Sequence, residues 1–294
     1  MATEGFVPGL PYRLFYRSVG PTSGVPTVLA LHGGPGASLD YLSPLEDLSS
    51  LGYRVVLFDQ LGCGRSEIPT DHSLFTLDHH VRETEEVRRA LQLQRVHLVG
   101  SSYGGLLAIA FALAHPSALR SLTTVGGLAS VPLATAEMNR LRAQLPADVQ
   151  ATLDRCEADG TTGSGEYAAA AMQFYRRHLC RQVPFPPDLS RSLELAATHP
   201  VYPRMNGPSE FTITGTIRDI DLSSRLPQVR VPTLVLGGRY DEVTPVVAEQ
   251  IYRGIPGARH HTFEASSHVP FWEERAEFLR VLGEFLAGID RAGG

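Results

Sequence analysis

The segment from Val96 to Gly105 constrains the fold of this chain more than any other feature of its sequence. It reads Val-His-Leu-Val-Gly-Ser-Ser-Tyr-Gly-Gly, an apolar, strand-like run that leads directly into the pattern Gly-x-Ser-x-Gly. Small and apolar residues continue to Ala114, as expected for a buried helix behind the turn. Glycines flank the serine because so sharp a turn leaves no space for side chains beside it. The segment therefore predicts a strand, a tight turn that presents Ser102, and a helix.

Further short apolar runs alternate with segments of helical spacing along the chain. Such alternation is typical of a mainly parallel sheet with helices on both faces. We therefore expect an α/β fold with strands at 27–31, 54–58, 96–99, 122–125, 233–236 and 260–263. An earlier stretch, 12–19, alternates apolar and polar residues and predicts an antiparallel hairpin strand at the edge of the sheet.

Two segments outside these runs have the apolar spacing of helices packed on a sheet. Residues 77–91 carry their apolar side chains on one stripe, with Glu83, Glu85 and Arg89 on the opposite side, and so predict a surface helix. Residues 278–286 repeat the apolar spacing near the end of the chain.

The alternation stops between residues 132 and 220, where strand-like runs are missing and Ala, Arg and Leu dominate several helical stretches. Three prolines at 184, 186 and 187 interrupt this segment, and residues 161–165 predict a loop. We therefore expect a core domain made of residues 1–131 and 221–294, with an inserted helical cap domain at 132–220.

Composition and charge exclude several classes of protein. The net charge is -5 and the 26 basic residues are scattered, which argues against a nucleic-acid partner. The first ten residues lack a signal-peptide core and no segment approaches about 18 consecutive apolar residues, so we expect a cytoplasmic protein with no membrane partner. Cys63, Cys156 and Cys180 show no close spacing of the kind found in metal sites or disulfide frameworks, and we interpret them as reduced thiols.

A serine hydroxyl is a weak nucleophile until a base removes its proton, so Ser102 needs a histidine that a carboxylate orients. In the α/β-hydrolase fold, of which Gly-x-Ser-x-Gly after a strand is typical, the chain order is serine, acid, histidine. Asp241 follows the run 233–236 and His268 follows the run 260–263, so each lies just beyond an expected strand end. We predict Asp241 and His268 as the partners of Ser102, with the adjacent Glu242 as the competing acid.

Attack on a carbonyl also creates an oxyanion, which needs preorganised hydrogen-bond donors. The backbone N–H of Tyr103, at the start of the helix after Ser102, is one expected donor. The other is expected from His32-Gly33-Gly34-Pro35-Gly36, with the N–H of Gly34 favoured. Neither a metal nor an organic cofactor is required by this chemistry, because the three side chains supply both nucleophile and base.

Together these motifs resemble the proline iminopeptidases, most closely those of the tricorn-interacting-factor type. Apart from the Gly-x-Ser-x-Gly motif, which a whole superfamily shares, the combination of His-Gly-Gly-Pro-Gly with Asp-Gln-x-Gly-x-Gly-x-Ser is much narrower. The matching segments span nearly the whole chain: 32–36, 59–66, 100–105, 206–211, 240–245 and 267–268. Asp59 and Arg65, within the second segment, need only a structural ion pair that holds the loop.

The resemblance implies a serine aminopeptidase in which Ser102, Asp241 and His268 are catalytic. It also implies that Glu210 and Glu242 bind the amino terminus of the substrate, with Tyr202 as their neighbour. The implied reaction removes an N-terminal residue, proline or another small or apolar one, from short peptides or amino-acid amides with a free N-terminus.

Two other classes stay open on the sequence alone. The same residues would serve an amino-acid amidase or an esterase that is indifferent to the ammonium group. A binding protein that has kept the fold without the reaction is a second alternative, although such proteins usually lack a member of the triad. Neither the preferred N-terminal residue nor the oligomeric state follows from the pattern of residues.

Overall fold

The computed structural model describes residues 2–293, and these form one eight-stranded sheet in the order β1-β2-β4-β3-β5-β6-β7-β8. Strand β2 is antiparallel to both of its neighbours, and all other neighbouring strands are parallel. The strands are β1 (Ala2–Phe6), β2 (Phe15–Val19), β3 (Thr27–Leu31), β4 (Arg54–Phe58), β5 (Val96–Ser101), β6 (Leu119–Val125), β7 (Thr233–Gly238) and β8 (Arg259–Phe263).

This topology confirms the expected α/β fold and each of its six parallel strands. The expected antiparallel strand is β2, but its predicted place at the edge is wrong, because β1 pairs along its outer side. The sequence of β1, Ala-Thr-Glu-Gly-Phe, has little apolar character, and four of its five residues are exposed, so no buried pattern marked it.

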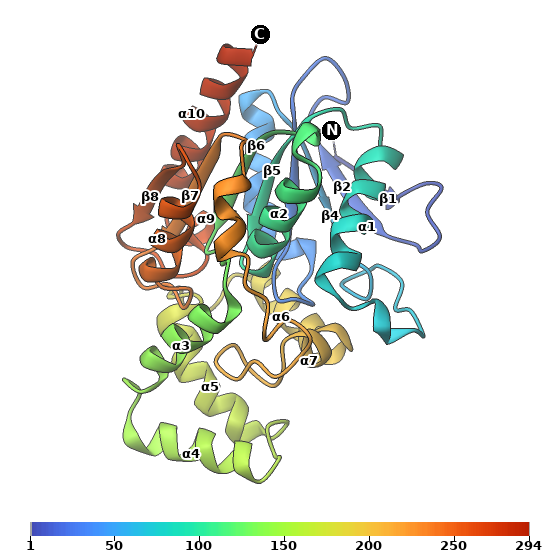
Figure 1. Cartoon of the computed structure of the whole chain (residues 1–294). Helices are drawn as coiled ribbons and strands as arrows, with labels where there is room; N and C mark the ends of the chain where they lie inside the picture. Colours follow the sequence, from blue (N-terminus) through green and yellow to red (C-terminus); the bar gives the residue numbers. More distant parts are fainter. Residues whose placement is uncertain (1, 294) are drawn as a thin grey trace.

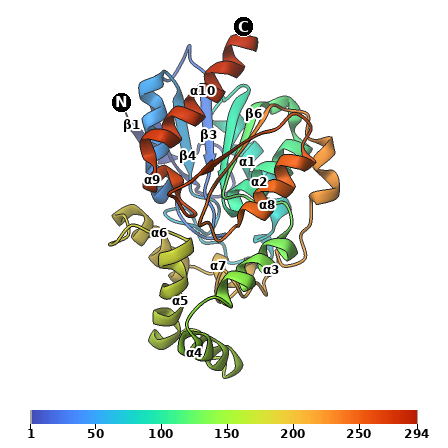
Figure 2. The same cartoon turned by 90° about the vertical axis from the view of Figure 1, so that its left-hand side faces the viewer.

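Helices cover both faces of the sheet (Figures 1 and 2). One face carries α1 (Leu77–Ala90), α2 (Tyr103–Ala114) and α8 (Pro245–Gly254), and the other carries the 3-10 helix η1 (Leu39–Leu51), α9 (Pro270–Glu273) and α10 (Arg275–Gly293). Alternate residues of β3 point to the two sides, so Leu29 and Leu31 belong to one hydrophobic core and Val28 and Ala30 to the other. Between residues 2 and 293, no helix is both long and apolar enough to cross a membrane.

Helix α1 is present where the spacing predicted it, but the predicted exposure of Glu83 and Glu85 is wrong, because both residues are buried. Glu83 is only 3% exposed and its Oε2 accepts the N–H of Leu61 at 3.0 Å. The loop after β4 therefore covers this side of the helix. Burial raises the pKa of Glu83 to about 8.

The chain between β6 and β7, residues 126–232, is here called the helical insertion. Its helices are α3 (Val131–Arg142), α4 (Ala147–Ala158), α5 (Gly165–His178), α6 (Pro187–Thr198) and α7 (Val201–Met205), followed by the 3-10 helix η4 (Ser223–Gln228). In Figure 1, α3 to α7 lie beyond one edge of the sheet, with α4 farthest from it. A bridge between Ser130 and Asp221 joins the two ends of this helical region.

Candidate active site

Ser102 stands at a strained turn between β5 and α2. Its backbone has φ 58° and ψ -126°, a left-handed conformation that side chains rarely adopt. The flanking glycines are required sterically, since a Cβ on Gly100 would lie 2.0 Å from the carbonyl oxygen of Gly104 and one on Gly104 would lie 2.3 Å from that of Leu31. The turn therefore exposes the Ser102 side chain at the carboxyl end of the central strand.

Asp241 and His268 meet on the loops that follow β7 and β8. His268 Nδ1 lies 2.6 Å from Asp241 Oδ1, which also accepts the N–H of Val243 at 2.8 Å. Both side chains are almost fully buried, at 1% and 3% exposure. Burial alone would lower the pKa of His268, but the carboxylates of Asp241 and Glu242 outweigh it and raise that pKa to about 9. The contact leaves Nε2 as the free nitrogen of the ring.

The backbone around Gly126 brings His268 and Ser102 to the same edge of the sheet. The N–H of Ser102 donates to the carbonyl oxygen of Val125 at 2.9 Å. The next residue, Gly126, has φ 54°, and a Cβ there would lie 2.7 Å from His268 Nδ1 and 2.9 Å from Asp241 Oδ2. Only glycine fits at this position, because any side chain would displace the imidazole or the carboxylate.

A single pocket collects the side chains that the sequence placed far apart. Ser102 and His268 line it together with Gly34, Tyr202, Glu210 and Glu242. Its remaining lining is mostly apolar and comes from both the core and the insertion: Ala37, Tyr41, Leu179, Leu189, Ser192, Leu193, Ala196 and Val269. A second, adjoining pocket shares Gly34, Ser102 and Glu210 and is otherwise lined by Tyr103, Leu128, Met138, Asn206, Ile213, Ile217 and Val243.

Gly34 and Tyr103, whose N–H groups are the predicted oxyanion donors, both line the adjoining pocket. The N–H of Tyr103 is the first of α2, so it has no carbonyl one turn earlier to bond. The N–H of Gly34 donates no hydrogen bond within residues 2–293. The Tyr103 side chain points away into the core, where its hydroxyl lies 2.8 Å from Nδ1 of the buried His80.

Glu210 and Glu242 place two carboxyl groups in the pocket that holds Ser102. Glu242 is 1% exposed and its Oε1 lies 3.7 Å from His268 Nε2, while its Oε2 is buried with no hydrogen-bond partner in residues 2–293. Glu210 Oε1 accepts the hydroxyl of Tyr202 at 2.7 Å. Burial raises the pKa of both glutamates, and for Glu242 the charges of Glu210 and Asp241 add to the increase. Within residues 2–293, the salt-bridge partner of this pair of acids is the His268 ring, whose charge acts against the increase in both pKa values.

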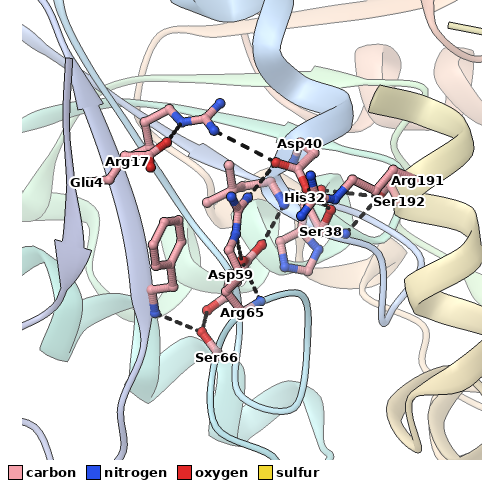
Figure 3. A network of polar contacts seen from close by, with 12 residues as sticks. Glu4, Arg17, His32, Ser38, Asp40, Asp59, Arg65, Ser66, Arg191 and Ser192 are labelled. Carbon is pink, nitrogen blue, oxygen red and sulfur yellow. Dashed lines mark hydrogen bonds and ion pairs between the residues drawn. The ribbon is translucent and has the colours of Figure 1, made fainter. Parts of the chain in front are cut away.

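Asp59 and Arg65 form the predicted ion pair, with Arg65 Nε 3.6 Å from Asp59 Oδ2, and they belong to a larger network (Figure 3). Asp59 also accepts the N–H of Leu39 at 2.7 Å, which ties it to the start of η1. The Arg65 guanidinium contacts Asp40, a carboxylate that Arg191 of α6 also approaches at 3.5 Å. The network therefore joins the loop after β4, the start of η1 and the helical insertion.

Helix α6 is bonded to the segment that follows the predicted oxyanion loop. The Ser192 hydroxyl accepts the N–H of Ser38 at 2.8 Å and donates to the Ser38 carbonyl oxygen at 3.3 Å. Nearby, the Ser43 hydroxyl donates to Asp188 at 2.6 Å. Ser192 could not be predicted from the sequence, because its partner lies 154 residues away and a serine within a helix carries no local signal.

Comparison with known proteins agrees with the fold. The family described as alpha/beta hydrolase fold matches residues 26–275. A proline iminopeptidase of Saccharolobus solfataricus is 42% identical over 284 residues, which are 96% of this chain and 92% of that protein. Among solved structures, VinJ has a TM-score of 0.94 and 40% identity, covering 98% of this chain and 99% of its own. The proline iminopeptidase of Mycobacterium smegmatis has a TM-score of 0.91 and 37% identity, covering 99% of this chain and 100% of its own.

Proposed function

This chain belongs to the proline iminopeptidases of the α/β-hydrolase fold, and from that membership we propose that it removes one N-terminal residue from short peptides. The released residue is proline or another small apolar one. The observation that carries the proposal is the pair of carboxyl groups, Glu210 and Glu242, in the pocket of Ser102 and His268.

The pair recognises the end of a peptide through its charge. Two buried carboxylates repel each other unless a cation lies between them, and a free α-ammonium group supplies that cation. At 4 Å each attraction amounts to about 4 kcal/mol with an intermediate dielectric, before desolvation is subtracted. Since only the first residue of a peptide carries the ammonium, the pair selects unblocked chain ends.

The reaction is an acyl transfer through Ser102. His268 removes the hydroxyl proton as Ser102 attacks the first carbonyl carbon, and the N–H groups of Gly34 and Tyr103 bind the oxyanion. His268 then gives the proton to the departing amine, so that the peptide bond breaks and the N-terminal residue remains as an ester on Ser102. Water, deprotonated by His268, hydrolyses this ester and restores the serine.

The bound ammonium group also favours the neutral form of the base, His268. Asp241 and Glu242 raise the pKa of His268, which favours a protonated ring that cannot accept a proton. A cation beside Glu242 offsets the charge of that carboxylate and favours the neutral ring. Substrate with a free amine therefore helps to create the protonation state that the reaction needs.

Residues 132–220 of the helical insertion form a cap domain over this site. Its helix α6 lines the main pocket with Leu189, Leu193 and Ala196, while Met138 of α3 lines the adjoining one. Walls on both sides of Ser102 admit narrow, flexible chains and exclude folded protein. The adjoining pocket is mostly apolar and accommodates the side chain of the residue to be released.

The test compares substrates that differ only at the amine. Prolyl p-nitroanilide and N-acetylprolyl p-nitroanilide have the same scissile bond. The free amine should be turned over at least about 100-fold faster, because acetylation removes the charged contacts with both glutamates. Equal rates for the two compounds would rule out an aminopeptidase and favour an amidase or esterase. Alanyl, leucyl and prolyl p-nitroanilides then rank the preferred first residue.

A further inference from the structure

The phenol of Tyr41 lies beside the nucleophile and binds the loop that carries Gly34. The N–H of Gly33 donates to Tyr41 Oη at 2.8 Å. A Cβ on Gly33 would lie 2.6 Å from Ser102 Cβ and 3.1 Å from Tyr41 Oη, so Gly33 is in van der Waals contact with the Ser102 side chain and with the phenol oxygen. Tyr41 is 5% exposed and lines the same pocket as Ser102.

The other side of Gly33 is held as well. Its carbonyl oxygen accepts the N–H of Ala37 at 3.2 Å and lies 3.0 Å from His32 Nδ1. His32 Nε2 accepts the N–H of Gln60 at 3.0 Å, which places the ring proton on Nδ1 and directs it at Gly33. Burial lowers the pKa of His32 to about 4, so the imidazole is neutral.

These bonds determine where the N–H of Gly34 points. The carbonyl of Gly33 and the N–H of Gly34 belong to one planar trans peptide group and point in opposite directions. His32 and Ala37 hold the carbonyl of Gly33, so the peptide group between Gly33 and Gly34 cannot rotate without breaking a buried hydrogen bond. Tyr41 holds the N–H of Gly33, which belongs to the peptide group before it. The N–H of Gly34 consequently stays free and directed away from these partners.

Tyr41 is itself held by α9, the short helix that follows His268. Its carbonyl oxygen accepts the indole N–H of Trp272 at 2.8 Å, and its ring packs on Phe271 with the ring centres 5.9 Å apart. Phe271 and Trp272 belong to α9, which begins two residues after His268. Tyr41 thus connects the segment of the oxyanion donor with the segment of the base.

We propose that Tyr41 is a positioning residue for the acyl transfer: by accepting the N–H of Gly33, its phenol oxygen holds the peptide group directly before the one that presents the Gly34 N–H to the oxyanion, and so fixes Gly33 on its N-terminal side. This inference rests on the acyl-transfer reaction proposed above. It predicts that the phenol oxygen matters to the tetrahedral state and little to the binding of ground-state ligands.

The test variant is Tyr41→Phe, which removes one oxygen and keeps the ring and the carbonyl that Trp272 contacts. Tyr53→Phe is the matched control, because Tyr53 is equally buried at 5% and its hydroxyl donates to Asp290 of α10, away from the pocket. With prolyl p-nitroanilide, we expect Tyr41→Phe to lower kcat by about 10- to 100-fold and to change KM by less than about threefold, since one oxyanion donor is misplaced rather than removed. Tyr53→Phe should leave kcat within about twofold of the unmodified enzyme.

The affinities of two inhibitors distinguish a positioning role of Tyr41 from a general loss of folded structure. A prolyl boronic acid forms a tetrahedral adduct on the serine, whereas free proline does not. Tyr41→Phe should weaken the boronate by a factor close to the loss in kcat and leave the inhibition constant of proline unchanged. If Tyr41→Phe does not fold, Trp272→Phe removes the N–H that the Tyr41 carbonyl accepts and should lower kcat with KM retained.

The outcomes distinguish this inference from the proposed function. If the unmodified enzyme hydrolyses p-nitrophenyl acetate but no aminoacyl anilide, the aminopeptidase proposal fails, and Tyr41 is then judged on the ester. Unchanged kcat and boronate affinity in Tyr41→Phe would overturn the positioning role. An equal loss in Tyr53→Phe, or a parallel loss of proline binding, would overturn it as well.

Discussion

Oε1 of Glu242 lies 3.7 Å from Nε2 of His268, on the side of the imidazole opposite its contact with Asp241. One ring therefore lies between two carboxyl groups that are neighbours in the sequence, one at each nitrogen. The first orients the base, and the second belongs to the pocket that we propose for the substrate ammonium. This arrangement links recognition of a chain end to the protonation of the base, and several of the expected outcomes below depend on it.

Replacing the nucleophile tests whether this chain is an enzyme or a binding protein with the same fold. Ser102→Ala should reduce turnover of prolyl p-nitroanilide by at least about 10⁴-fold, because no other group can form the acyl intermediate. Binding of proline, followed by calorimetry, should persist. Turnover that survives the substitution would remove Ser102 from the reaction.

Replacing an anchor tests the role of the carboxyl pair. Glu210→Gln should weaken the binding of free-amine substrates by about 1 to 3 kcal/mol and spare an N-acetylated ester, because the lost partner is a charged hydrogen-bond acceptor. The control is Glu249→Gln on α8, a partly exposed glutamate paired with Arg253. If the ester and the free amine lose affinity alike, Glu210 is not an ammonium anchor.

The pH dependence tests the contact between Glu242 and His268. The carboxylate of Glu242 raises the pKa of His268, and the base works only when neutral, so in the free enzyme the acidic limb of kcat/KM should lie on the alkaline side of neutrality. Glu242→Gln removes that charge, lowers the pKa of His268 and should shift the limb to lower pH. The measurement uses an N-acetylated ester, whose amine does not titrate; an unmoved limb would contradict the coupling.

The contribution of helix α6 to catalysis can be tested at the hydrogen bonds between Ser192 and Ser38. Ser192→Ala leaves the N–H and the carbonyl of Ser38 without their partner, which should cost about 1 to 3 kcal/mol of unfolding free energy and lower kcat. Ser43→Ala is the matched control, since its bond to Asp188 joins the same two elements outside the oxyanion loop. We expect only Ser192→Ala to lower kcat. A comparable loss in both would mean that docking of the helix, rather than its hold on Ser38, matters.

Glu83 provides a test of stability against pH. Its pKa is raised from the ordinary 4.5 to about 8 by burial, so the folded protein favours the neutral carboxyl group. Because the pKa of Glu83 is higher in the folded protein than in the unfolded chain, Glu83 contributes most to the free energy of unfolding below pH 4.5, the ordinary pKa. That contribution is lost as the pH rises toward and through 8, the pKa in the folded protein. Glutamine imitates the neutral form, so the melting temperature of Glu83→Gln relative to the unmodified protein should rise across this window. Glu194→Gln, an exposed change on α6, should show no such trend.

Much of the site could be predicted because its signals are local. The turn at Ser102 follows from glycines that lie within two residues of it, and Asp241 and His268 follow from their places just after strands. Glu210 had no comparable signal, since it lies on a loop of the insertion and only the family resemblance assigned it a role.

The residues that escaped prediction depend on contacts between distant parts of the chain. Tyr41 has the pattern of an ordinary core residue, and its role arises only because the phenol meets Gly33 next to Ser102. The spacing of apolar residues in α1 predicts that Glu83 faces solvent, but the loop after β4 covers it in the structure. In each case a partner supplied by the tertiary fold, rather than the periodicity of the element, decides what the side chain does.

In the site that we propose, the nearness of the ammonium pocket to the nucleophile limits release to one residue at a time. An α-ammonium and the first carbonyl carbon are separated by only two covalent bonds, of about 1.46 and 1.52 Å. With Glu242 in contact distance of the ring that serves Ser102, a chain whose end is held there can present its first carbonyl but not its second. Release of a dipeptide would require the carboxyl group of residue 242 to lie farther from Ser102 by about one residue, some 3.8 Å between successive Cα atoms. The adjacent positions 241 and 242 therefore determine that one residue is released in each cycle.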